Sequence, residues 1–408
     1  MLRKLRFWVM ITVMSVVLGV RAASPVPGHN VSPDTLRVSL ITCDQGPDIY
    51  QVFGHSAVRI QRSGAHGFDW VFNYGIFSFS DDFIYKFTKG ETDYLLGVYD
   101  FNDFIVDYVM RGSSVYEQEI DLSPAQRERL FNMLVENAAP QNRVYRYNFL
   151  FDNCATRPRD MIEKAIAVDG EHIRYEVCDS LKSFRSLIRH YAANYSWLTF
   201  GIDLALGHDL DRKATWREQM FVPLILNNAC NHAVIVQQDG TLSRPVVKGE
   251  ATLYDSGYIP VLPPTPWYMS PLFVAIVLFL LTSAITACDV RKMRLSRWYD
   301  TMIFTALFVA GIIIYFLVLC SEHPATTFNI NALWITPCAI IAAVLPYVRK
   351  AGKVVYIYHI ANVALIALYL LLVAVRVQVI DVAVLPMVAA VAMRSSNYIY
   401  YSLKQYSK

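Results

Sequence analysis

The sequence has few charged residues and lacks the common nucleotide- and metal-binding motifs. Only 17% of its 408 residues are Asp, Glu, Lys or Arg, and the formal net charge is +3. No Lys/Arg-rich run supplies the basic stripe that nucleic-acid binding requires, so that class of partner is excluded. A P-loop, a dinucleotide fingerprint, a His-Glu-x-x-His motif and a serine in a nucleophile elbow are all missing. We therefore expect no cofactor and no metal ion.

Hydrophobic residues make up 54% of the chain and gather at its extreme N-terminus and in its last third. The first residues are basic (Arg3, Lys4), and an apolar run from Phe7 to Val20 leads to small residues around Ala22. This order is typical of a secretory signal peptide, so we predict that residues 1–22 are removed. An uncleaved anchor is the alternative, but the run is short for a membrane span.

The last third contains five apolar segments after a proline-rich stretch. They lie at 270–288, 301–320, 331–347, 354–375 and 379–393, and the last is the weakest because Pro386 interrupts it. Each is long enough, or nearly so, to cross a bilayer. Two ionisable residues, His359 and Asp381, lie near span ends without an evident partner, so a transport role is disfavoured. Residues 266–408 are therefore predicted to be an all-α, five-helix transmembrane domain.

Loop charges predict how these segments are oriented. The basic residues are Arg291, Lys292, Arg294 and Arg297 in the first loop, Arg349, Lys350 and Lys353 in the third, Arg376 alone in the fourth, and Arg394, Lys404 and Lys408 in the tail. The second loop, 321–330, has none. By the positive-inside rule the C-terminus is cytoplasmic and the 23–265 region is exported. The signal peptide predicts the same orientation independently.

The exported region reads as an α+β domain with an antiparallel sheet. We expect strands at 36–43, 55–62, 68–77, 94–99, 114–122 and 144–149, helices at 124–137 and 153–167, a mainly helical stretch from 180 to 230, and a short hairpin at Asp239-Gly240. Ser123 and Gln126 fit a capping box at the start of the first helix. For the aromatic segments 77–87 and 101–108 we favour core packing over contact with lipid tails.

Four of the seven cysteines, Cys43, Cys154, Cys178 and Cys230, face an oxidising compartment. Secreted cysteines usually pair, so two disulfides are possible, and the sequence does not choose the partners. Three further cysteines lie in the predicted spans and are interpreted as small apolar residues.

Cys154 differs from the others in its context, Asp-Asn-Cys-Ala-Thr-Arg. It follows a predicted strand and is expected in the first turn of a helix, where the helix dipole and free backbone N–H groups favour a thiolate and can bind an oxyanion. Arg157 and Arg159 add positive charge nearby. This pattern is typical of a nucleophile, although a helix-start cysteine without function is common.

His55 is the candidate base for this thiol. It follows Gly54 at the start of a predicted strand, where its ring can point into a cleft; a purely structural histidine is the alternative. A third group is needed to orient the imidazole. With the hairpin turn centred near Ala65, the residue across from His55 falls near Asn73 to Gly75. Asn73 is the preferred polar candidate there, with Asp69 and His66 behind it.

Several stretches of the sequence resemble a known family. They are GPDIYQVFGHSAVRI, VFNYG, YRYNFLFDNCATRPRD and GIDLALGHDLDRKATWREQMFVPLIL. These resemble the exported domain of the Lnb family of lipoprotein N-acyltransferases over roughly residues 36–230. The order His before Cys, with Asn directly before Cys, is similar to permuted papain-like folds. The resemblance implies a permuted papain-like periplasmic domain in which His55 matches the catalytic histidine and Cys154 the nucleophile, with Asn73 as a third member.

The resemblance also implies a reaction and a place for it. An acyl chain would pass from a phospholipid donor, through a Cys154 thioester, to the N-terminal amine of a diacylglyceryl-cysteine apolipoprotein, in the bacterial inner membrane. A phospholipase and a cell-wall amidase or peptidase would use the same His/Cys pair. A non-catalytic receptor or assembly factor, with Cys154 in a disulfide, is the alternative of another class.

Overall fold

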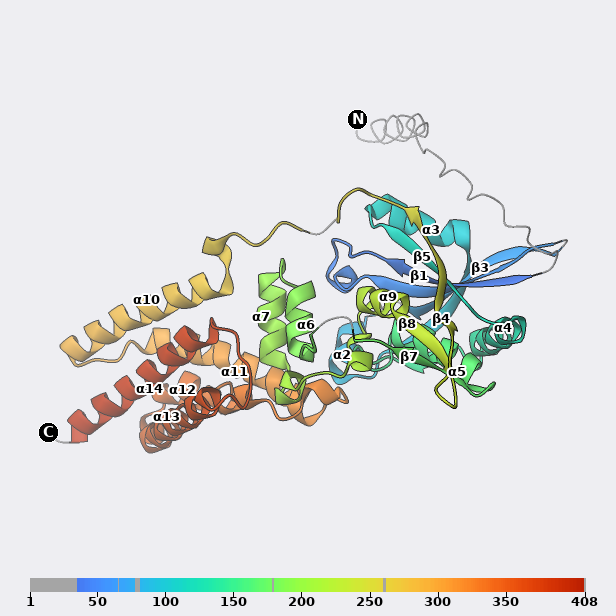
Figure 1. Cartoon of the computed structure of the whole chain (residues 1–408). Coiled ribbons are helices and arrows are strands. Elements are labelled where there is room, and N and C mark those ends of the chain that lie inside the picture. Colours follow the sequence, from blue (N-terminus) through green and yellow to red (C-terminus); the bar gives the residue numbers. More distant parts are fainter. Residues whose placement is uncertain (1–34, 65, 78–80, 178–179, 260–261, 407–408) are drawn as a thin grey trace, which may run out of the picture.

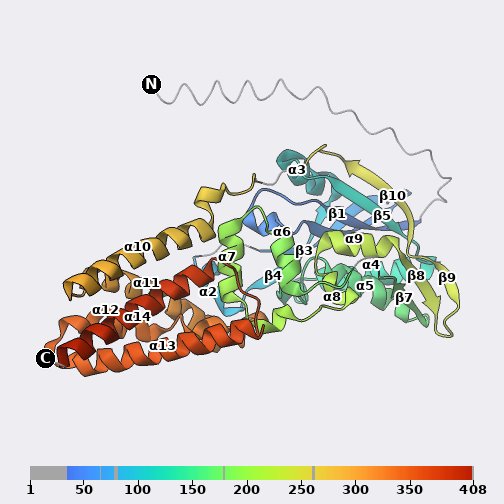
Figure 2. The ribbon, with the colours of Figure 1, turned by 60° about the vertical axis from the view of Figure 1, so that its left-hand side comes forward.

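The computed structural model describes residues 35–64, 66–77, 81–177, 180–259 and 262–406. The predicted signal peptide, 1–22, and Cys178 lie outside these residues. The described chain forms a mixed α/β part, from which a bundle of long helices extends (Figures 1 and 2). We call these parts the periplasmic domain and the membrane domain.

A seven-stranded sheet forms the centre of the periplasmic domain, and all its paired strands are antiparallel. In spatial order the strands are β10 (Val247–Tyr254), β5 (Val115–Ile120), β1 (Leu36–Cys43), β2 (His55–Arg62), β3 (Phe68–Ile76), β4 (Asp93–Asp100) and β6 (Val144–Arg146). The expected antiparallel sheet is therefore present. The strand expected at 144–149 is shorter, and β10 was not anticipated as a strand.

The hairpin of β2 and β3 has the predicted register. Arg62 pairs with Phe68 and Val58 pairs with Phe72, so the turn is centred on position 65. This register matters because it fixes which residues of β3 lie beside the start of β2. β1 runs along the other edge of β2, and its last residue, Cys43, pairs with His55.

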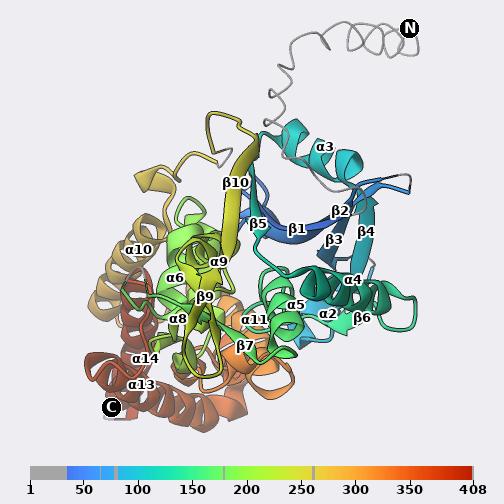
Figure 3. The same cartoon turned by 45° about the vertical axis from the view of Figure 1, so that its right-hand side comes forward.

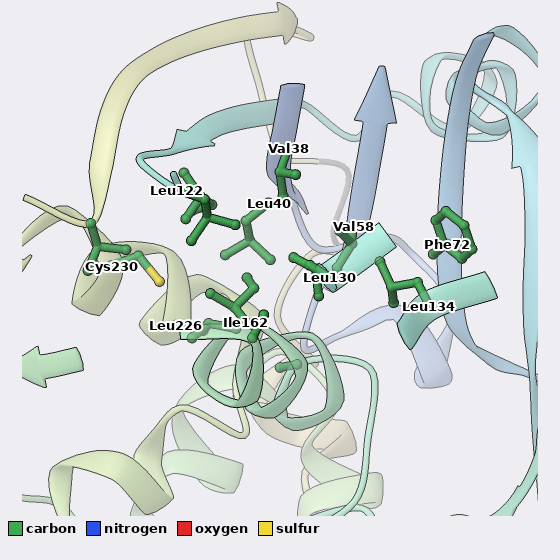
Figure 4. Packing of buried hydrophobic residues seen from close by; sticks show 14 of the residues in the cluster. Val38, Leu40, Val58, Phe72, Leu122, Leu130, Leu134, Ile162, Leu226 and Cys230 are labelled. Atoms are coloured by element: carbon green, nitrogen blue, oxygen red, sulfur yellow. The ribbon is translucent and has the colours of Figure 1, made fainter. Parts of the chain in front are cut away.

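Helices cover one face of this sheet and close the core (Figures 3 and 4). The packing joins Val38, Leu40, Val58 and Phe72 of the sheet to Leu130, Leu134, Ile162 and Leu226 of the helices. These helices are α4 (Pro124–Ala138), α5 (Thr156–Ala167) and α9 (Pro223–Asn231). The predicted capping box of α4 is confirmed, because Ser123 and Gln126 bond to each other's backbone. α5 begins at Thr156, later than expected.

Two helices lie between strands of the sheet, in the two aromatic segments 77–87 and 101–108 for which the sequence predicted no helix. α3 (Phe101–Arg111) buries Phe104 and Tyr108, so the expected core packing is confirmed there. In α2 (Phe83–Lys89) no side chain is buried, so the same expectation was wrong for this helix. Phe77, at the start of the same segment, packs against the core as expected. The stretch from 180 to 230 is mainly helical as expected, and besides α9 it contains α6 (Phe184–Tyr191) and α7 (Ser196–Ala205).

A second, three-stranded sheet consists of β7 (Glu171–Tyr175), β8 (Ala233–Gln237) and β9 (Leu242–Pro245). Its β8–β9 hairpin turns at Gly240, as predicted, with a φ of +84° that favours glycine. The segment from 231 to 254 is thus part of the folded domain, because β8 and β10 each pair within a sheet.

Four segments of the membrane domain are long and apolar enough to span a bilayer. They are α10 (Pro271–Lys292), α11 (Arg297–Leu319), the segment Ile330–Tyr347, which is broken into short helical pieces, and Arg349–Ala374, which includes α13 (Gly352–Ala374). The fifth predicted span falls partly in α14 (Val384–Tyr406), which packs between α10 and α13 but is less apolar. Its crossing of the membrane therefore stays a prediction.

Two polar residues of this domain differ from the sequence-based expectation. His359 is buried and bonds through Nδ1 to Ser395 Oγ at 3.0 Å, so it has the partner that the sequence did not show. Arg394, counted above as a tail charge, is buried against Asp289 and Asp300 at 2.9 and 2.6 Å. Arg394 thus links α14 to the C-terminal end of α10 and to the N-terminal end of α11.

Candidate functional site

The site begins with the tight turn that leads into β2. Gly54 has a φ of +75°, and a Cβ there would lie 2.6 Å from the carbonyl oxygen of Cys43. Only glycine fits this position without strain. The turn places His55 at the first position of β2, half-buried at the end of the sheet.

Asn73 of β3 holds the His55 ring. His55 Nε2 lies 2.6 Å from Asn73 Oδ1. An amide oxygen only accepts hydrogen bonds, so Nε2 carries the proton and the lone pair of the neutral ring is on Nδ1. Burial lowers the pKa of His55 to about 4, against the opposing effect of the Asn73 hydrogen bond. The ring is therefore uncharged at neutral pH.

The other two candidates for the orienting residue, Asp69 and His66, do not orient the imidazole. Asp69 accepts hydrogen bonds from Arg59 and Gln61. His66 is exposed in the hairpin turn, at the opposite end of β2 from His55. Neither lies at the position from which it would orient the imidazole.

Cys154 reaches the same place from a turn before α5. A Cβ at Gly75, in the bulge at the end of β3, would lie 3.5 Å from Cys154 Cβ and 3.8 Å from His55 Cε1. Gly75, with a φ of +97°, thus marks the point where the cysteine and the histidine converge. The sequence placed this glycine opposite His55 but assigned it no role, although the pattern Asn-Tyr-Gly in a strand is a signal for a bulge.

The turn that carries Cys154 is held by Asn153. Asn153 Oδ1 accepts from the backbone N–H groups of Ala155 and Thr156 at 2.8 and 2.9 Å. Its Nδ2 donates to the carbonyls of Phe149 and Phe221 at 2.7 and 2.9 Å. The side chain uses both its donor hydrogens and its acceptor oxygen in this way, and it therefore fixes the backbone on both sides of the cysteine.

The electrostatic expectation for Cys154 was wrong. Burial raises the pKa of its thiol to about 11, although backbone N–H groups of Ser56 and of Cys154 itself act in the opposite direction. Arg157 adds no effective positive charge because it is paired with Asp152, and Arg159 bonds to Asp160 and to the carbonyl of Arg217. The helix begins two residues after the cysteine, beyond the closest reach of its dipole.

The possible disulfide bridges do not form among the described cysteines of the domain. Cys43, Cys154 and Cys230 are free thiols. Cys43 and Cys230 are buried, and burial raises the pKa of Cys43 far above its usual range and that of Cys230 to about 12. These two are therefore unreactive packing residues, whereas Cys154 is half-buried beside a histidine.

These features define a class: a membrane-anchored protein whose periplasmic domain brings a free cysteine and an oriented histidine together. The Lnb N-terminal periplasmic domain matches residues 25–189, and the Lnb transmembrane domain matches residues 264–406. The chain carries both domains in the expected order, and it belongs to the Lnb family. No curated protein and no solved structure matches it.

Proposed function

We propose that this protein is a lipoprotein N-acyltransferase of the bacterial inner membrane. It would move an acyl chain from a phospholipid, through a thioester on Cys154, to the N-terminal amine of a diacylglyceryl-cysteine apolipoprotein. The observation that carries this proposal is the convergence of a free Cys154 thiol with a His55 ring that Asn73 holds through Nε2. A permuted papain-like arrangement of the domain, with histidine before cysteine, is part of the proposal.

In the first half-reaction, His55 Nδ1 takes the proton of the Cys154 thiol as the sulfur attacks the ester carbonyl. The backbone N–H groups of Ser56 and Cys154, which lower the pKa of the Cys154 thiol against the effect of burial, would stabilise the oxyanion. The C–O bond of the ester then breaks. The lysophospholipid alkoxide leaves with the proton from His55, and a thioester remains.

In the second half-reaction, the lipoprotein amine attacks the thioester carbonyl. His55 takes a proton from the amine and returns it to the departing sulfur of Cys154. The products are an N-acylated lipoprotein and the free thiol. A thioester suits this step because it is a good acyl donor to amines. Both substrates reside in the layer to which the membrane domain confines the enzyme, which raises their effective concentration.

The test is mass spectrometry of the N-terminus of a reporter lipoprotein in cells that rely on this chain. A third acyl chain that is present with the native protein and with Cys230→Ala, and absent with Cys154→Ala, would support the proposal. Cys230 is the matched control because it is a free thiol of the same domain outside the site. A third chain that persists without Cys154 would refute the thioester. Free fatty acid in place of the third chain would indicate a phospholipase.

The other readings predict different products. A cell-wall amidase or peptidase would release peptide fragments and leave the lipoprotein unchanged. A receptor or assembly factor would tolerate Cys154→Ala without a chemical change. The disulfide on which that reading depended is not formed, since Cys154 is a free thiol.

A further inference from the structure

α2 presents an apolar face that the periplasmic domain does not cover. Ile84, Tyr85 and Phe87 are 79%, 57% and 45% exposed. Large apolar side chains grouped on one short helix are unusual on a surface that faces water, and such groups mark sites that contact membranes or partners. The position of α2 decides between these possibilities.

The loop after α11 fixes α2 to the membrane domain. Ser321 Oγ donates a hydrogen bond to the carbonyl of Thr88 at 2.8 Å. The backbone N–H of Glu322 donates to the carbonyl of Lys89 at 2.7 Å. His323 Nε2 bonds to the carbonyl of Phe87 at 2.7 Å. These are the last carbonyls of the helix, which have no partner within it. The loop therefore caps α2.

Ring contacts extend this attachment to the span itself. The ring of Tyr85 lies 6.0 Å from that of Phe316 in α11. Leu319, at the end of α11, is 73% exposed, so the apolar surface of the span continues to the level of α2. This end of α11 carries the loop on the periplasmic side, because that loop bonds to the periplasmic domain. α2 thus lies where the outer leaflet ends.

From α2 a line of aromatic rings leads inward. Phe87 contacts Phe83 at 5.9 Å between ring centroids, Phe83 contacts Phe77 at 5.3 Å, and Phe77 contacts Tyr94 at 5.0 Å. Tyr94 stacks on Tyr147 at 4.0 Å. We call these five residues the aromatic track.

The inner end of the aromatic track lies beside the nucleophile. Asn148, which follows Tyr147 in the chain, pairs through its backbone with Asp152, two residues before Cys154. Phe77 lies two residues beyond Gly75, where a Cβ would be 3.5 Å from Cys154 Cβ. The track therefore connects the surface of a membrane span to the candidate nucleophile through apolar groups. An acyl chain that left the bilayer along this route would stay out of water.

We propose that the exposed face of α2 lies in the outer leaflet and takes up the acyl chain of a phospholipid, whose ester reaches Cys154 along the aromatic track. The use of that ester in acyl transfer rests on the proposed function; the contact of α2 with lipid does not.

The contact is tested by photocrosslinking of the full chain in vesicles of phosphatidylethanolamine and phosphatidylglycerol. Benzoylphenylalanine is placed at Ile84 or, as a control, at Val135 of α4. Val135 is 44% exposed, on a helix at the far side of the domain from the membrane helices (Figure 1). After illumination we expect an added mass of one phospholipid at position 84 and none at 135. No adduct at 84, or equal adducts at both positions, would overturn the proposal.

The route is tested with Ile84→Glu and Val135→Glu in the same vesicles. Because a carboxylate at membrane depth is costly, we expect Ile84→Glu to lower acyl transfer from vesicle phospholipid about ten-fold. Alkylation of Cys154 by iodoacetamide should be unchanged in both variants, which shows that the site is intact. Unchanged transfer by Ile84→Glu would overturn the route and leave the proposed function standing. A lipid adduct at 84 without N-acylation by the native protein would refute the function instead.

Discussion

The hydrogen bond between His55 and Asn73 allows a quantitative test of the proposed roles. Asn73→Ala removes the acceptor that His55 Nε2 has among the described residues, at 2.6 Å. The proton can then move to Nδ1, and the ring no longer presents its lone pair to Cys154. A hydrogen bond of this kind contributes about 1 kcal/mol net, and each 1.4 kcal/mol changes a rate about ten-fold. We expect acyl transfer at neutral pH to fall about five- to ten-fold.

The pH profile of Asn73→Ala distinguishes a misoriented His55 ring from a change in the protonation of His55. The Asn73 hydrogen bond raises the pKa of His55, while burial lowers it to about 4. Without Asn73 the pKa falls further, so the acid limb of the profile, where His55 gains a proton and ceases to be a base, moves to lower pH. His55 is already neutral at pH 7 in the native protein. A slower reaction at pH 7 therefore reports orientation.

The assay is the initial rate of acyl transfer to a diacylglyceryl peptide in vesicles between pH 3 and pH 9. Asn137→Ala is the matched control, because Asn137 Oδ1 accepts a 2.6 Å hydrogen bond from Tyr74 away from the cysteine. This control should cost stability and leave the rate per folded molecule unchanged. A native rate for folded Asn73→Ala, or an acid limb that moves to higher pH, would refute the reasoning.

Three further outcomes follow from the site. Alkylation of Cys154 by iodoacetamide, followed by mass spectrometry, should keep rising with pH above 9, since its thiol pKa is about 11; a plateau near pH 7 would reveal an ion pair instead. Arg111→Leu should move the acid limb to higher pH, because the Arg111 charge lowers the pKa of His55; an unchanged limb would exclude that influence. Asn153→Ala, which removes four hydrogen bonds, should lower the free energy of unfolding by about 2–4 kcal/mol in a denaturant titration, and a loss below 1 kcal/mol would show that water replaces them.

Local patterns in the sequence predicted those parts of the site that depend on short-range order. Two strand-like segments on either side of a turn located β2 and β3, and the symmetry of that turn placed Asn73 near His55. The same reasoning could not place Cys154, because it approaches through a turn fixed by carbonyls of Phe149 and Phe221. Phe221 is remote in sequence, and no periodicity reveals such a contact.

Burial is the second quantity that the sequence did not reveal. The context of Cys154 predicted a thiolate on the assumption of an exposed helix start, and the structure shows a desolvated thiol. Apolar residues in α2 and α3 looked alike in the sequence, yet α3 buries Phe104 and Tyr108 while α2 exposes Tyr85 and Phe87. Arg394 similarly appeared to be a tail charge and is buried between two aspartates. In each case the partner comes from a distant part of the chain.

The neutral resting state of the pair bears on how the proposed reaction would favour transfer over hydrolysis. With pKa values of about 11 for Cys154 and about 4 for His55, unaided proton transfer between them costs on the order of 10 kcal/mol. In the proposed reaction the thiolate would therefore form only as the ester carbonyl arrives, where the backbone N–H groups would take up the charge that develops on the carbonyl oxygen. The burial that keeps the pair neutral also limits the water near a thioester. An α-amine, with a usual pKa near 8, is partly neutral at pH 7 and can attack. A buried, uncharged pair reached from the bilayer is thus suited to an amine acceptor that is itself carried by lipid.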